Sequence, residues 1–91
     1  MAYGSKTITT AATLVVGANA KRQVLMIVNH SSKICFIGPD ASITTATGIP
    51  LYEYSTKENT KTIGGHYLGD IYAIASDVGN SDVRYWEVTG A

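Results

Sequence analysis

The apolar residues of this chain come in short runs, and this spacing limits the fold more than any other feature of the sequence. The runs TLVVGA and VLMIV have the length of a strand and are followed by polar or turn-forming residues. No segment keeps the i, i+3, i+4 apolar spacing of a helix for about ten residues without Gly, Pro or a β-branched run. We therefore expect an all-β chain with little or no helix.

About seven short strands are expected, at intervals of roughly 8 to 12 residues with turn residues between them. Two polar connections favour antiparallel hairpins, one through residues 29–32 and one through residues 76–82. This pattern predicts one domain over residues 1–91, a small antiparallel β-sandwich or jelly-roll-like barrel, in which residues 1–6 are free to form a flexible N-terminal arm. The expected strands lie within residues 7–17, 23–28, 33–37, 49–54, 61–63, 71–75 and 82–88.

The stretch GPDASITTATG, residues 38–48, predicts a long loop because it is rich in residues that form turns. Gly48 tolerates backbone angles that other residues avoid, and Pro50 holds Ile49 in extended geometry. Pro50 also has no N–H to give to a neighbouring strand. The sequence therefore predicts a turn into an edge strand that is open to a partner only beyond Pro50, at residues 51–54.

Charge and cysteine content exclude several classes of function. Seven basic and seven acidic residues give a formal net charge of zero, and only Lys21 and Arg22 form a basic pair, so we expect no nucleic-acid binding. Cys35 is the only cysteine, so no intramolecular disulfide can form, and it is expected to be a small buried apolar residue. Cys35, His30 and His66 do not make a tetrahedral metal site, and no cofactor is expected. A low net charge promotes association.

The beginning of the sequence, MAYGSKTITT, lacks the basic and apolar regions of a secretory signal peptide. The apolar runs also fall far short of the roughly 18 residues that a membrane-spanning helix needs. We therefore expect synthesis in a cytoplasm and no membrane association.

A serine hydrolase site is a weak alternative. His30 stands beside Ser31 and Ser32, and His66 precedes Asp70 by four residues. However, no G-x-S-x-G turn holds a serine and no oxyanion hole is evident. Solvated polar turns explain these residues better, and we expect a protein that is not an enzyme.

The aromatic residues allow three interpretations: an ordinary rim of the core, an interface with a protein, or a platform on which sugars stack. Tyr52 and Tyr54 share one face if their strand continues. A glycan platform would use Tyr54, Tyr67 and Trp86. A protein interface would be formed by Leu51, Tyr52, Tyr54, Tyr67 and Trp86.

The strands within residues 24–28 and 34–37 are apolar on both faces. One face of an isolated two-layer sandwich is expected to be polar. Either loops of the chain cover the outer faces of these strands, or another subunit packs on them.

Several short motifs follow one another along the chain. They are an A-x-x-R lead, an L-x-I-x-N strand, a strand that ends in Gly, a loop that closes on G-I-P-L, and a terminal G-x-I-Y-A-I-A with D-V-R-h-h-E, where h is apolar. In this sequence they occupy residues 18–22, 25–29, 37–38, 48–51, 69–75 and 82–87, and the first has one residue more between Ala18 and Arg22 than the motif has. Together these motifs resemble a small family of β-sandwich proteins that are encoded in the structural gene clusters of tailed bacteriophages.

The resemblance implies a virion structural protein without enzymatic activity, made in the cytoplasm of the host bacterium. It implies capsid decoration or another accessory role on the phage head, through contacts with a capsid protein and with copies of itself, most simply as a trimer. The alternative is a glycan-binding module of a fibre or tail tip. The sequence departs from the family pattern after Leu51, where the polar segment 55–65 is longer and is expected to form a contact loop of its own.

Overall fold

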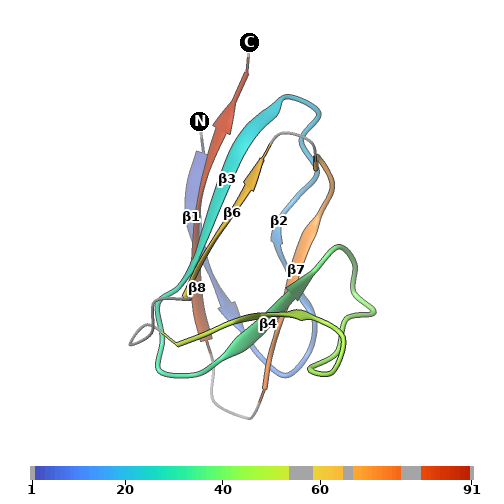
Figure 1. The fold of residues 1–91 in the computed structure, drawn as a ribbon, viewed down its shortest axis with the longest axis vertical. Coiled ribbons are helices and arrows are strands. Elements are labelled where there is room, and N and C mark those ends of the chain that lie inside the picture. The colour runs from blue at the N-terminus through green and yellow to red at the C-terminus, as the bar shows by residue number, and fades with distance from the viewer. Residues whose placement is uncertain (1, 54–58, 65–66, 77–80, 91) are drawn as a thin grey trace.

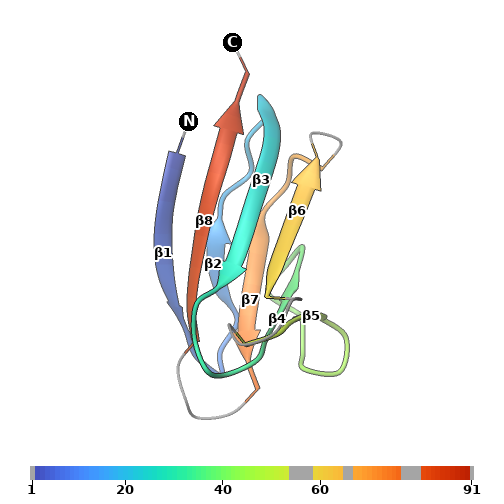
Figure 2. The same cartoon turned by 60° about the vertical axis from the view of Figure 1, so that its left-hand side comes forward.

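The computed structural model describes residues 2–53, 59–64, 67–76 and 81–90. Its strands form two antiparallel sheets that pack face to face, and the described residues contain no helix, so none that could span a membrane (Figures 1 and 2). The expected all-β fold is confirmed. The strands are β1 (Ala2–Ile8), β2 (Thr13–Val16), β3 (Arg22–Asn29), β4 (Cys35–Gly38), β5 (Ile49–Leu51), β6 (Thr60–Gly64), β7 (Ile71–Ala75) and β8 (Ser81–Thr89).

The order of the strands is that of a jelly roll. Sheet A has the order β1-β8-β3-β6, and sheet B has the order β2-β7-β4-β5. Strands pair from the two ends of the chain inward, β1 with β8, β2 with β7, β3 with β6 and β4 with β5. The chain is thus one long antiparallel hairpin that is rolled up, and the additional pairs β3–β8 and β4–β7 close each sheet.

Both predicted hairpins are wrong, because their two strands lie in different sheets. β3 belongs to sheet A and β4 to sheet B, and the same holds for β8 and β7. The buried side chain of Asn29 fixes the first crossing. Its Nδ2 donates to the carbonyl oxygens of Lys33 at 2.7 Å and Leu51 at 3.0 Å, and so ties the end of β3 to sheet B. An apolar alternation predicts which face of a strand is buried, but not which strand lies beside it.

The N-terminal part also differs from the expectation. The single strand expected over residues 7–17 is divided, because residues 9–12 carry the chain from sheet A to sheet B. Residues 2–8 form the edge strand β1 in place of a flexible arm, paired with β8 from Ala2 opposite Glu87 to Ile8 opposite Ser81. The described residues therefore form eight strands where about seven were expected.

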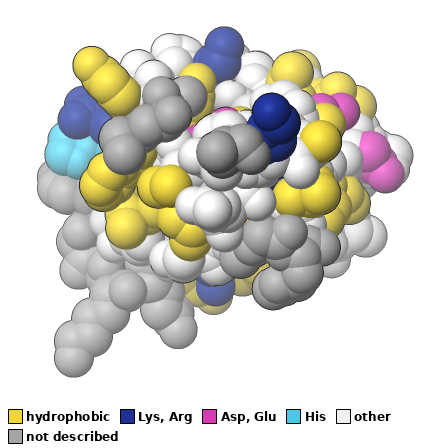
Figure 3. Space-filling view, turned by 90° about the horizontal axis from the view of Figure 1, so that it is seen from above, with side chains coloured by type: hydrophobic (Ala, Val, Ile, Leu, Met, Phe, Trp, Pro, Cys, Tyr) yellow, Lys and Arg dark blue, Asp and Glu magenta, His cyan; other side chains and the backbone are white. Residues whose placement is uncertain are grey.

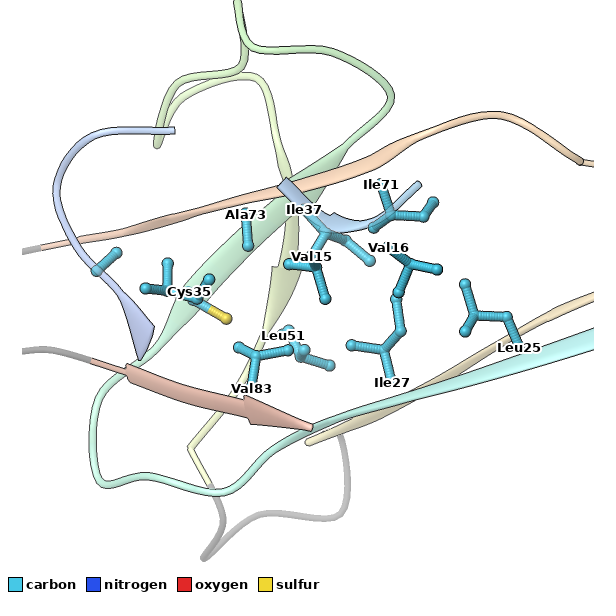
Figure 4. Packing of buried hydrophobic residues seen from close by; sticks show 12 residues of the cluster. Val15, Val16, Leu25, Ile27, Cys35, Ile37, Leu51, Ile71, Ala73 and Val83 are labelled. Atoms are coloured by element: carbon cyan, nitrogen blue, oxygen red, sulfur yellow. The ribbon is translucent and has the colours of Figure 1, made fainter. Parts of the chain in front are cut away.

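The core lies between the sheets, where alternate residues of each strand point inward (Figure 4). Cys35 is fully buried, as expected, and burial raises the pKa of its thiol from 9.0 to about 12. Each fully buried aliphatic side chain contributes about 1.5 to 3 kcal/mol to stability. The cluster comprises Ile8, Val15, Val16, Leu25, Ile27, Cys35, Ile37, Leu51, Ile71, Ala73, Ala75 and Val83.

The long loop and the edge strand are where the sequence predicts them. Residues 39–48 connect β4 to β5, and the loop closes where the amides of Thr47 and Gly48 donate to the carbonyl of Thr44. β5 forms the edge of sheet B and ends at Leu51. Tyr52 and Glu53 do not extend the strand.

Candidate functional site

An apolar row crosses the outer face of sheet A. Tyr3 of β1 lies opposite Trp86 of β8, which lies opposite Met26 of β3. Because residues directly opposite each other point to the same side of a sheet, these three side chains share the face that points away from the core. They are 83%, 48% and 39% exposed, respectively. The described residues leave this row open to solvent.

Valine side chains widen this row into a patch. Val24 lies opposite Val88, and Val28 lies opposite Arg84, on the same outer face. Met26, Val28 and Trp86 line a shallow depression of about 140 Å³, with Arg84 at its side. Arg84 is occupied by an exposed ion pair with Asp82 at 3.1 Å. The sheet A patch, as we name it, consists of Tyr3, Val24, Met26, Val28, Trp86 and Val88.

Strands that are apolar on both faces can be covered by loops of the chain or by another subunit, and the two sheets differ in this respect. In sheet B the chain covers itself, because loop 39–48 lies against β4. A Cβ atom added to Gly48 would lie 2.7 Å from the Cβ of Phe36, and Phe36 is only partly exposed. In sheet A no described loop closes over Met26 and Trp86. An external partner is therefore needed only to explain sheet A.

The five residues that the sequence predicts as an interface do not form one surface. Leu51 is fully buried in the core, so its side chain is not an interface residue. Tyr52 is half-buried beyond β5, and Tyr54 lies outside the described residues. Tyr67 packs against the core, and its hydroxyl donates to the carbonyl of Asp70 at 2.6 Å. Of the four predicted residues that the structure describes, Trp86 alone belongs to the sheet A patch.

The predicted glycan platform is not assembled by the described residues. Tyr67 lines an apolar groove of about 260 Å³ between β6 and sheet B, together with Ile37, Ile49, Ile63 and Ile71. Trp86 points away from the core on the outer face of sheet A. The two aromatic rings therefore lie on different surfaces.

Sequence reasoning missed Tyr3 as the neighbour of Trp86, because residues 1–6 were expected to form an arm. Residues 3–8 contain a signal that could have predicted this strand. Tyr3, Ser5 and Thr7 alternate with Gly4, Lys6 and Ile8, as expected for an edge strand of which one end is buried.

A cleft of about 390 Å³ opens at the opposite side of the sandwich from the apolar groove, between the edge strands β1 and β2. Lys6, Tyr85 and Glu87 contribute polar groups from sheet A. Leu14, Val15 and Val16 of β2 form the apolar wall, and residues 17–19 complete the cleft.

A buried ion pair lies beside this cleft. Arg22 Nε donates to Glu87 Oε2 at 2.6 Å, and both side chains are almost fully buried. The other nitrogens of Arg22 donate to the carbonyl oxygens of Gly17, Tyr67 and Gly69 at 3.0 to 3.1 Å. These hydrogen bonds use four of the five N–H groups of the guanidinium and hold two loops and β8 together at one end of the sandwich.

The weak hydrolase alternative finds no common site. Ser31 follows the end of β3, where its hydroxyl donates to Asn29 Oδ1 at 2.6 Å. Asp70 precedes β7 near the beginning of β3, and its Oδ1 accepts the amide of Ala18 at 2.7 Å. The eight residues of β3 separate these positions by roughly 25 Å. His66 lies outside the described residues.

Among the described residues, the Lys and Arg side chains visible on the end of the molecule that carries both termini lie apart from one another (Figure 3). Comparisons with protein-family models, with curated proteins and with solved structures found no match. The function of this chain is therefore inferred from its own surfaces and motifs.

Proposed function

We propose that this chain is a structural protein of a tailed-bacteriophage virion without enzymatic activity. It decorates the assembled head or serves it as another accessory protein, and it does so as a homo-oligomer. The observation that carries the proposal is the sheet A patch, in which Tyr3, Trp86 and Met26 form an exposed apolar row across three paired strands. The motif resemblance to phage structural proteins supports the class of partner.

The chemistry of the patch suits a protein contact. Aromatic residues and Met are enriched in protein interfaces, whereas the centres of interfaces contain few charges. Among the residues that the structure describes, the charged pair beside the row is that of Arg84 with Asp82, at its margin. Burial of apolar area contributes about 25 cal/mol per Å², and many identical sites on a shell add up even when each one is weak.

Self-association is tested by light scattering over a tenfold dilution series. The wild-type protein is expected to be a closed oligomer, most simply a trimer, and Trp86→Ser combined with Met26→Ser is expected to be a monomer with unchanged unfolding. Ile49→Ser is the matched control, because Ile49 is 54% exposed on the edge of sheet B. A monomeric wild-type protein, or dissociation by the control alone, would contradict the use of the sheet A patch.

The place in the virion needs a separate measurement. Mass spectrometry of gradient-purified phage particles from the host that encodes the chain is expected to detect it in fixed proportion to the major capsid protein. Its absence from intact particles would overturn the assignment to the virion.

A further inference from the structure

We propose that the cleft between β1 and β2 is a binding site for a neutral, hydroxyl-rich ligand, that is, one or two sugar rings. The side chains that sheet A contributes to the cleft, those of Lys6, Tyr85 and Glu87, alternate along their strands with those of the sheet A patch and lie on the inner side of the sheet. Its volume of about 390 Å³ lies at the lower end of the range of about 300 to 1,000 Å³ that is usual for small-ligand sites.

Three polar groups of the cleft have hydrogen-bonding capacity left over. Within the part of the chain that the structure describes, Lys6 Nζ and the hydroxyl of Tyr85 have no protein partner. Glu87 uses Oε2 for Arg22, and its Oε1 accepts no further protein hydrogen bond. All described buried side-chain nitrogens and oxygens have partners, so Glu87 Oε1 is in contact with solvent. Two donors and one acceptor therefore converge on one cleft.

Gly4 gives the Tyr85 ring its position. Tyr85 lies opposite Gly4 on the neighbouring strand. A Cβ atom at Gly4 would lie 3.0 Å from the Tyr85 hydroxyl and 3.2 Å from the adjacent ring carbons, so only glycine lets the ring lie across β1 without a shift. Glycine within a strand often marks such a close approach. The ring thereby becomes part of the cleft lining instead of projecting into solvent.

The charges select the class of ligand. An anion attracted by Lys6 would meet the carboxylate of Glu87, and a cation attracted by Glu87 would meet Lys6 and Arg22. A hydroxyl group both donates and accepts, so sugar hydroxyls can donate to Glu87 Oε1 and accept from Lys6 and Tyr85. The C–H face of a sugar ring can pack on Leu14 and on the Tyr85 ring.

The test is a titration of the ¹⁵N-labelled protein, followed by NMR, with glucose, galactose, mannose and N-acetylglucosamine at millimolar concentrations. At least one sugar is expected to shift the amides of Gly4, Lys6, Leu14 and Tyr85. Lys6→Gln and Tyr85→Phe should each weaken binding about fivefold, the effect of one lost hydrogen bond. Trp86→Ser is the control, because it changes the opposite face of the same strand and should leave sugar binding unchanged.

Three results would overturn the proposal. The first is that none of the four sugars shifts the amide signals. The second is that the shifted signals centre on Trp86 and still shift in Tyr85→Phe. The third is that acetate binds more strongly than any of the sugars. Lys6→Gln changes an exposed side chain and keeps the fold, so its result remains interpretable if Tyr85→Phe lowers stability. None of these outcomes depends on the virion assignment, because that is tested by oligomeric mass and by particle composition.

Discussion

Arg22 and Glu87 lie on neighbouring strands of sheet A and form a buried ion pair, in which Arg22 Nε is 2.6 Å from Glu87 Oε2. Removing the carboxylate leaves the Arg22 charge buried without an opposite charge, with only its hydrogen bonds to backbone carbonyls. Glu87→Gln is therefore expected to lower the free energy of unfolding by about 3 to 5 kcal/mol, as measured by urea denaturation.

The exposed pair of Arg84 and Asp82 is the matched control for this prediction. Both of its side chains are in contact with solvent, so Asp82→Asn is expected to change the free energy of unfolding by less than about 1 kcal/mol. Equal losses in Glu87→Gln and Asp82→Asn would show that the buried pair has no special role.

The side chain of Asn29 joins the two sheets through the carbonyl oxygens of Lys33 and Leu51. Asn29→Ala removes both of these hydrogen bonds and the acceptor of the Ser31 hydroxyl, while the carbonyl oxygen of Lys33 keeps the hydroxyls of Ser31 and Ser81. The lost hydrogen bonds predict a decrease of about 2 to 3 kcal/mol in the free energy of unfolding. Ser31→Ala removes only a hydroxyl that donates to Asn29 Oδ1 and to Lys33, and its cost should be about 1 kcal/mol or less. Thermal unfolding of both variants, followed by circular dichroism, decides whether Asn29 has the larger effect.

Gly48 is expected to reject any larger side chain. A Cβ atom there would lie 2.7 Å from Phe36 Cβ and 3.2 Å from the carbonyl oxygen of Thr44, so Gly48→Ala should cost about 1 to 3 kcal/mol. At Gly17 an added Cβ has no neighbour within 4 Å, so Gly17→Ala should change stability by no more than about 0.5 kcal/mol. Calorimetry of the two variants compares them directly, and a neutral Gly48→Ala would contradict the close packing of loop 39–48.

Burial makes the Cys35 thiol unreactive in the folded protein. Its pKa is raised to about 12, so we expect almost no reaction with a disulfide reagent at pH 8 until urea unfolds the chain.

The raised pKa of Cys35 also makes the stability of the fold depend on pH. Between pH 9 and about 12 the unfolded chain loses the thiol proton while the folded chain keeps it, so stability falls as pH rises through this window. The free energy of unfolding of Cys35→Ala should fall less steeply with pH in this window than that of the wild-type protein. Equal slopes for the two proteins would contradict the raised pKa.

The sequence predicts the strands of this protein better than their neighbours. Short apolar runs and the turn residues around Pro50 correctly indicate an all-β chain, the loop at 39–48 and the edge position of β5. The same signals do not predict which strands pair with β3 and β7. A connection of a few polar residues can join two neighbouring strands as a hairpin, or it can carry the chain from one sheet to the other. The buried end of β3 at Asn29 is the clue that separates the two.

The short motifs at residues 18–22, 25–29, 37–38, 48–51 and 82–87 contain residues that hold the fold together. Arg22 and Glu87 form the buried ion pair, Asn29 joins the sheets, and Gly38 and Gly48 make room for Ile43 and Phe36. These motifs therefore contain information about the fold. The exposed residues Tyr3 and Met26 of the sheet A patch do not occupy a defined position in any motif. This explains why the candidate site was predicted less well than the architecture.

Pairing from the two ends of the chain inward also sets the order in which this protein can fold. Among the described strands, β1 is synthesised before the others and its partner β8 after them, so sheet A cannot close until translation has passed residue 89. Pairs so distant in sequence form slowly. Until then the strand that pairs with β1 in the described sheet is missing from the nascent chain. Nascent copies on one polysome thus carry free strand edges side by side, and dependence on chaperones should be greatest at that stage.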